Sequence, residues 1–188
     1  MKIRVLPLVA ALALPAVAQM PPSPAGSAAA GSATAGLKFP WYRVKDLLVR
    51  AAEKMPEENY AFRASPDVRS FGQLVGHVAD ANFMFAAMAA GEKPMPRDIE
   101  KTKTSKADLV AALKESFAAA DKAFGMSDAD LATATKLFGM DTNRYAVVGL
   151  LIGHDWEHYG NMVTYMRIKG IVPPSSEPRP EAPRPAAK

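Results

Sequence analysis

Apolar residues recur at helical spacing in four segments of this chain, and the pattern predicts four helices. The first helix should begin near Pro40 and end at Pro56, because proline cannot continue a helix from within. Its inward face is expected to consist of Trp41, Val44, Leu47, Leu48 and Ala51. Residues 57–69 lack a clean period, so we expect a long connection with a short turn of its own.

Capping residues bound the second predicted helix. Ser70 is suited to its N-cap, and Gly91 follows its expected end at Ala90. The Pro-Met-Pro sequence at residues 94–96 then marks a loop. One face of this helix forms a stripe that consists of Gln73, His77, Met84 and Met88.

A capping signal also opens the third predicted helix. Ser105 and Asp108 resemble a capping box with aspartate in place of glutamate, and Gly125 should stop the helix. The residues expected to point inward are Leu109, Leu113, Phe117 and Ala120.

The last helix is the longest predicted element. It should begin at Thr142 or Asn143 and run to Lys169, with Gly170 as its cap and the prolines at 173–174 beyond it. Its inward stripe is expected to include Val147, Leu150, Leu151 and Met162. No strand pattern or internal repeat is visible, so we predict an all-α fold, a four-helix bundle.

The N-terminal segment, residues 1–18, has the pattern of a cleaved signal peptide. A basic start precedes an apolar run at residues 5–14, and Ala-Val-Ala at 16–18 fits a cleavage site that would leave Gln19 first. A transmembrane anchor is the competing interpretation, but about 14 apolar residues fall short of the roughly 20 that span a bilayer. We expect a periplasmic or secreted protein with no membrane anchor after cleavage.

Composition predicts the remaining boundaries. Residues 19–38 are rich in Pro, Ala, Gly and Ser, so we expect a flexible linker. The helical bundle domain should occupy residues 39–176. Residues 177–188 are Pro-rich and charged, which predicts a disordered tail.

Charge and cysteine content restrict the classes of partner. The 23 basic residues fall to 21 once Lys2 and Arg4 leave with the signal peptide, against 19 acidic residues, which gives a net charge of +2. This balance predicts no nucleic-acid partner. Because the chain has no cysteine, a metal ion would have to be held by nitrogen and oxygen atoms.

All three histidines lie in apolar helical segments. His154 and His158 are four residues apart, which places both imidazoles on one face of the last helix. His77 lies on the second helix, so packing of the two helices could bring three rings together. A hydrogen-bonded core histidine is the simpler interpretation of any one of them, but an imidazole among apolar side chains is costly without a partner. We therefore predict a metal site of His77, His154 and His158.

The residues around this predicted site suggest what it would do. Three imidazoles without a fixed fourth ligand suit Zn²⁺ or Ni²⁺ and leave a position open for water or substrate. Asp80 and Glu157, each about one turn beyond a histidine, are candidate catalytic residues that could orient an imidazole or act as a base. A solvated helix face is an equally good interpretation of both carboxylates.

Residues 154–158 also match H-x-x-E-H, the pattern of inverted zinc metalloproteases, in which the glutamate activates water. That class needs a third ligand, a carboxylate, further along the chain. The candidates Glu177 and Glu181 lie in the predicted disordered tail, and His77 would have no purpose. The three-histidine site is therefore preferred.

Several motifs together resemble the DinB-like metal-binding family. They are GHVADAN at residues 76–82, GHDWEHYG at 153–160 and YMRIKGIVPPS at 165–175, and the resemblance covers residues 40–175. It implies a four-helix bundle of up-down-down-up topology with a divalent metal ion on His77, His154 and His158. Characterised members of the family include S-transferases and isomerases that use low-molecular-weight thiols.

The resemblance implies a metal-dependent enzyme that activates a thiol or water for transfer or hydrolysis on a small-molecule substrate, and the predicted signal peptide implies that this enzyme is exported. One alternative is a non-catalytic metal-binding or ligand-sensing bundle. Another is a structural bundle whose histidines are core polar groups. The sequence leaves the substrate and the oligomeric state open, a homodimer included.

Overall fold

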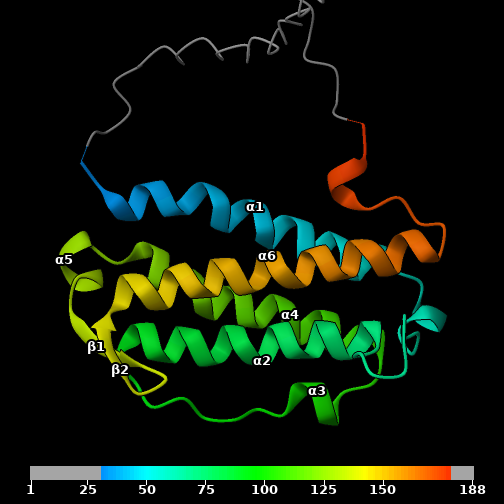
Figure 1. Ribbon diagram of the computed structural model, residues 1–188, viewed down its shortest axis with the longest axis horizontal. Helices are drawn as coiled ribbons and strands as arrows, with labels where there is room; N and C mark the ends of the chain where they lie inside the picture. The colour runs from blue at the N-terminus through cyan, green and yellow to red at the C-terminus, as the bar shows by residue number, and fades with distance from the viewer. Residues whose placement is uncertain (1–30, 179–188) are drawn as a thin grey trace, which may run out of the picture. The chain divides into compact units, whose positions relative to one another are not determined.

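The computed structural model describes residues 31–178, so the predicted signal peptide lies outside the described residues. From Ser32 onward, four main helices pack together (Figure 1): α1 (Ala33–Lys54), α2 (Phe71–Ala90), α4 (Lys106–Asp121) and α6 (Arg144–Ile168). The short elements between and after them are α3 (Ile99–Thr102), α5 (Asp128–Leu131), a two-stranded hairpin and the 3₁₀ turns Glu57–Asn59, Ala123–Gly125 and Pro174–Ser176. The predicted fold class is confirmed.

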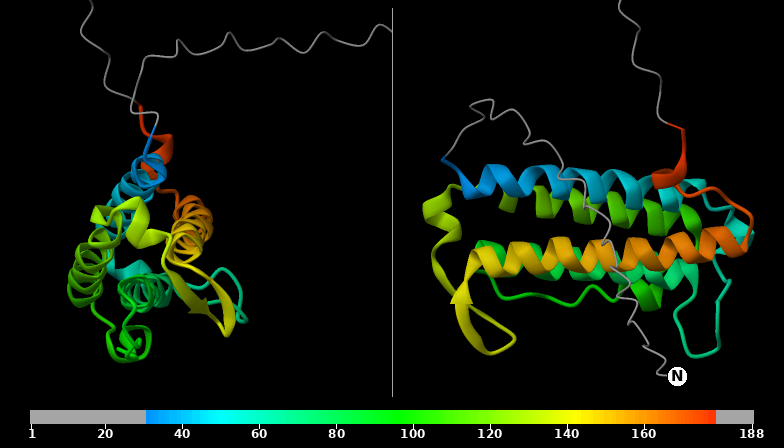
Figure 2. Two further views of the ribbon diagram at one scale, coloured as in Figure 1. Left: turned by 90° about the vertical axis from the view of Figure 1, so that its left-hand side faces the viewer. Right: turned by 45° about the horizontal axis from the view of Figure 1, so that its top comes forward.

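The long connection before α4 determines the topology. α1 and α6 run in one direction, and α2 and α4 run in the other (Figure 1). Because α2 and α4 are parallel, residues 91–105 have to return along the bundle, and they do so through α3. The end-on view in Figure 2 shows the four helices around one interior. This is the predicted up-down-down-up order.

Aromatic packing fixes α1 against α4. Trp41 is fully buried, with its ring stacked on Phe124 at 4.4 Å and tilted against Phe117 at 5.3 Å between centroids. Its indole N–H donates a hydrogen bond of 2.8 Å to Asp121, so the ring is buried without an unpaired polar atom. The predicted inward faces of α1 and α4 are buried throughout. Leu150 of α6 is an exception to the predicted core, because 39% of its surface is exposed.

α1 begins at Ala33 and not near Pro40, so part of the predicted linker is helical. The carboxylate of Asp128 accepts hydrogen bonds from the N–H groups of Ala33 (3.0 Å) and Thr34 (2.9 Å) and from the hydroxyls of Ser32 and Thr34. The bonds from Thr34 hold the pKa of Asp128 well below its usual range. This start depends on a residue far along the chain, and it has no apolar period that sequence patterns could detect.

A hairpin of β1 (Ala134–Leu137) and β2 (Met140–Asn143) corrects the prediction that the chain has no strands. The strands are antiparallel, with Leu137 opposite Met140. Phe138 and Gly139 form the two-residue turn, and both have positive φ, 50° and 85°. Four-residue strands are too short to show a clear alternation of apolar and polar residues, which is why the pattern was missed.

The described part of the C-terminal segment contacts the bundle. Glu177, predicted to begin a disordered tail, forms ion pairs with Arg50 and Lys54, the latter at 2.6 Å. Residues 179–188 lie outside the described range. None of the helices in residues 31–178 is long and apolar enough to cross a membrane.

Candidate metal centre

Three histidine side chains meet between α2 and α6. The Nε2 atom of His154 lies 3.2 Å from that of His77 and 3.1 Å from that of His158. One nitrogen from each of the three rings lies within 4.8 Å of the other two. Two nitrogens that share a tetrahedral zinc ion at the usual bond length are about 3.3 Å apart. The three side chains therefore have a spacing that could hold a metal ion, as the sequence predicted.

Burial favours the neutral form of two of these imidazoles, those of His77 and His158, and the neutral form is the one that binds metal. Burial lowers the pKa of His158 to about 3 and also lowers the pKa of His77. The neighbouring histidines add to both shifts, because a second positive charge so close would be repelled. At neutral pH each of these two rings consequently has one nitrogen with a free lone pair for a metal ion and one that carries its proton.

A carboxylate that sequence analysis missed orients His77. Glu100 of α3 lies 3.3 Å from the Nδ1 atom of His77, and Arg69 donates a hydrogen bond of 2.9 Å to the other oxygen of Glu100. A metal-binding histidine commonly donates its second ring N–H to a carboxylate, which fixes the tautomer. Glu100 is placed to do this, so the Nε2 atom of His77 is the one left to face the other histidines.

Asp80, the first candidate catalytic residue, forms hydrogen bonds with the backbone of α3. Its two oxygens accept hydrogen bonds from the N–H groups of Ile99 (3.0 Å) and Glu100 (2.9 Å) at the start of α3. The structure thus shows Asp80 holding the backbone that carries Glu100. A direct role of Asp80 as a base stays a prediction.

Gly76 allows α3 to lie directly on α2. A Cβ atom at this position would be 2.7 Å from the Cα of Glu100 and 2.9 Å from its nitrogen, which is closer than real atoms approach. Only glycine therefore permits this contact without displacing the backbone of α3. Gly76, Asp80 and Arg69 together determine where the carboxylate of Glu100 lies.

A second carboxylate, that of Asp155, is buried beside His154. Asp155 has no exposed surface, and neither of its oxygens has a hydrogen-bond partner among the described residues. One of them lies 3.6 Å from the Nδ1 atom of His154, which also has no partner there. Burial raises the pKa of Asp155 to about 6. A metal ion on the Nε2 atom of His154 would leave its Nδ1–H facing this carboxylate, so these orphaned atoms fit a metal site.

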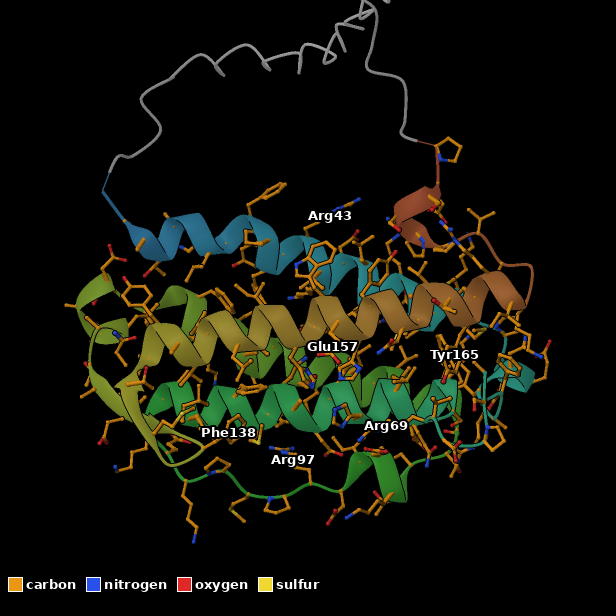
Figure 3. The ribbon with its side chains drawn as sticks, in the orientation of Figure 1. Arg43, Arg69, Arg97, Phe138, Glu157 and Tyr165 are labelled. Carbon is orange, nitrogen blue, oxygen red and sulfur yellow. The ribbon has the colours of Figure 1, made fainter. Side chains whose placement is uncertain are left out.

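Glu157, the second candidate catalytic residue, is exposed and lines a cavity. The cavity has a volume of about 560 Å³ and is lined by His158, Asn161, Arg69 and Tyr165 among others. Figure 3 labels Arg69, Glu157 and Tyr165 on this side of the bundle. The carboxylate of Glu157 therefore shares a cavity with a histidine of the cluster, and its role as a base stays a prediction.

Comparison with known proteins identifies the family. The sequence pattern of the DinB superfamily matches residues 41–162. The chain belongs to the DinB superfamily. The resemblance seen in the sequence motifs is thereby confirmed, and His77, His154 and His158 all lie inside the matched region.

Two solved DinB-like structures have a similar fold. The crystal structure of a DinB-like protein from Bacillus cereus ATCC 10987 has a TM-score of 0.65 and 20% identity, over 74% of this chain and 95% of that chain. A DinB-like protein from Bacillus subtilis has a TM-score of 0.61 and 21% identity, over 72% and 92% of the two chains. These identities support the fold alone. The comparison with curated proteins gives no match.

Proposed function

We propose that this DinB superfamily protein is an exported metal-dependent enzyme that acts on a small molecule by transfer or hydrolysis. The observation that carries the proposal is the meeting of three imidazoles in a half-buried site, where the Nε2 atom of His154 lies 3.2 Å from that of His77 and 3.1 Å from that of His158. Zn²⁺ and Ni²⁺ are the ions that best suit three nitrogen donors. Such an ion would supply Lewis-acid chemistry, which lowers the pKa of a thiol or of water.

The number of ligands favours catalysis over a structural role. Among the described residues, no aspartate, glutamate or fourth histidine joins the cluster of His77, His154 and His158. Structural zinc sites normally have four protein ligands, whereas catalytic sites have three and keep one position open. Two cavities, of about 560 and 640 Å³, also reach the histidines. This arrangement supports access for a substrate.

Glu157 is the residue that we propose as a base. It lines the cavity of about 560 Å³ together with His158, and its exposed carboxylate could accept a proton from a thiol or a water that enters there. Asp80 is proposed to act indirectly, by fixing α3 and hence Glu100 beside His77.

Activity of the metal-loaded protein tests the proposal. Protein stripped with a chelator and reloaded with Zn²⁺ or Ni²⁺ would be assayed for thiol addition to an electrophile and for ester hydrolysis. We expect turnover only in the loaded form, a loss of at least about 100-fold in His158→Ala, and a smaller loss in Glu157→Gln. Metal bound tightly with no turnover of any substrate class would instead favour a binding or sensing protein.

Export is a separate part of the proposal and has its own test. It rests on the basic start, apolar run and Ala-Val-Ala site of residues 1–18. Intact-mass analysis of the protein recovered from the cell envelope should give a chain that begins at Gln19. A full-length mass in that fraction would show that the segment is retained.

A further inference from the structure

A second cavity, of about 640 Å³, opens beside the candidate metal centre. His77 and His154 contribute to its wall, and most of the remaining wall is apolar: Met84, Phe85, Pro94, Met95, Phe138 and Leu150. Cavities of this size and composition bind small molecules, with a few polar groups that orient the ligand. The polar part of the wall consists of the two histidines, which belong to the candidate metal centre, and of five charged residues: Asp80, Arg97, Asp98, Glu100 and Lys101.

Three of the apolar side chains of this cavity are exposed. Met95 is 80% exposed, Phe138 65% and Leu150 39%, although Leu150 lies one turn before His154 on α6. Large apolar residues that gather in one exposed patch commonly mark a binding site. The exposure of Leu150, which the sequence pattern predicts to be buried, is explained if a ligand covers it.

The charged residues around the cavity already have partners. Asp80 accepts two backbone hydrogen bonds, and Asp98 pairs with Lys101 at 2.9 Å. Arg97, labelled in Figure 3, lies over the ring of Phe83 at 3.6 Å. These charges therefore offer little attraction to an ionic ligand, whereas the apolar wall favours an apolar one.

Phe138 occupies a position that disfavours it. It is the first residue of the two-residue turn between β1 and β2, where φ is 50° and asparagine is strongly preferred. A phenylalanine there costs about 1 kcal/mol or more in backbone strain, and 65% of its surface stays exposed. Its ring instead meets Phe85 edge-to-face at 6.4 Å, and Phe85 in turn meets the ring of His154 at 5.8 Å. The strain is accounted for if the ring of Phe138 contacts a ligand.

We propose that this cavity binds the apolar part of the substrate, an aromatic ring or a short alkyl chain, with Phe138 as a residue that selects for it. The head group of the same molecule would reach the metal ion on His77 and His154. This inference rests on the proposed function, because it needs a metal ion at the histidines. It adds the substrate class: an apolar small molecule with one metal-binding group.

Hydroxamates of increasing length test this proposal, because their head group binds zinc and their tail is variable. The Zn²⁺-loaded protein would be titrated calorimetrically with acetohydroxamate, hexanohydroxamate and benzohydroxamate. Each buried methylene strengthens binding by up to about fourfold, so hexanohydroxamate should bind at least about tenfold more tightly than acetohydroxamate. Benzohydroxamate should show a similar increase in affinity over acetohydroxamate.

Phe138→Asn and Met140→Asn form a matched pair of variants. Both residues lie in the hairpin and are 65% exposed, but only Phe138 lines the cavity. Asparagine suits the turn better than phenylalanine, so Phe138→Asn should keep or raise the thermal midpoint of the protein. In Phe138→Asn the larger hydroxamates should nevertheless bind little more tightly than acetohydroxamate. In Met140→Asn they should keep their higher affinity.

The other outcomes overturn the proposal in distinguishable ways. Equal binding of short and long hydroxamates would refute the apolar subsite while leaving the metal centre intact. Equal losses in the two variants would show that Phe138 has no special role. A change from dimer to monomer in Phe138→Asn would show that the exposed apolar residues contact a second copy of the chain. Protein that binds neither Zn²⁺ nor Ni²⁺ would refute the proposed function, and this inference with it.

Discussion

At the scale of single residues, two charged side chains, Arg69 and Glu100, connect the surface with His77. The guanidinium of Arg69 holds one oxygen of Glu100, and the other oxygen lies 3.3 Å from the Nδ1 atom of His77. The contact with Arg69 fixes the orientation of Glu100, and Glu100 in turn fixes the tautomer of His77. The affinity of the site for metal should therefore depend on a residue that is not itself a ligand.

Replacement of Glu100 tests this dependence. Glu100→Ala should weaken metal binding by about 10-fold to 100-fold, because the ring of His77 would lose the acceptor that orients it. Glu100→Gln keeps an acceptor but not the charge, so its affinity should lie between those of Glu100→Ala and the wild type. Competition with a chelator measures the affinity, and Glu58→Ala, an exposed glutamate of the connection before α2, is the control. Equal affinities in the wild type and Glu100→Ala would contradict the proposed role.

Asp155 leads to a prediction about pH in the metal-free protein. Its pKa is about 6 in the fold against 3.8 for an ordinary aspartate, so the folded state binds the proton more tightly. The resulting stabilisation is complete below about pH 4 and is lost as the pH rises through 6. Asp155→Asn should therefore stabilise the protein more at pH 7 than at pH 5, by about 1 kcal/mol. Urea unfolding at the two pH values measures the difference, and an equal effect at both would refute the shift.

The sequence identified some of these residues and could not have identified others. His154 and His158 are recognisable because a four-residue spacing places both on one helix face. Glu100 lies in an irregular connection, 23 residues beyond His77, and only the path of that connection brings it to the site. Asp155 is adjacent to His154 in the chain, where helical spacing gives no reason to expect a contact.

At the scale of elements, the contact between α2 and α3 positions the site. α3 has only four residues and would not be stable alone. It is held by hydrogen bonds to Asp80 and by the close approach of its backbone to Gly76. The packing of two elements thus sets the position of a carboxylate beside His77, a candidate metal ligand.

Alanine at Gly76 tests this packing. The added methyl group would be 2.7 Å from the Cα of Glu100, so α3 would have to move. Gly76→Ala should lower both the thermal midpoint and the metal affinity, the latter to about the level of Glu100→Ala. Gly149→Ala is the matched control, since a Cβ atom there meets nothing within 4 Å on α6 and alanine should stabilise the helix by about 0.5–1 kcal/mol. Unchanged affinity in Gly76→Ala would show that α3 does not set the site.

Element boundaries were predictable where a local signal marks them. The caps at Ser70, Gly91 and Gly170 were expected, and the structure has them at the ends of α2 and α6. The start of α1 depends on hydrogen bonds to Asp128, a contact between distant segments that leaves no periodic pattern in the sequence. The strands of the hairpin have four residues each, which is too short for a clear alternation.

At the scale of the whole described bundle, we expect the apolar core, and not the proposed metal ion, to stabilise the fold. The core contains large side chains with no exposed surface in all four main helices, such as Trp41, Phe71, Phe117 and Leu151. Burial of each contributes about 1.5–3 kcal/mol before the cost of ordering the chain. We therefore expect the fold to persist without metal, so that changes in the histidines act mainly on metal content.

Metal content of the three single histidine variants tests the central claim most directly. After loading with Zn²⁺ and removal of unbound ion, elemental analysis should find about one ion per chain in the wild type. His77→Ala, His154→Ala and His158→Ala should each lose most of it, and double variants should lose little more, because two imidazoles hold the ion far more weakly than three. Full metal in His77→Ala together with loss in His158→Ala would contradict the three-histidine site and favour the H-x-x-E-H alternative.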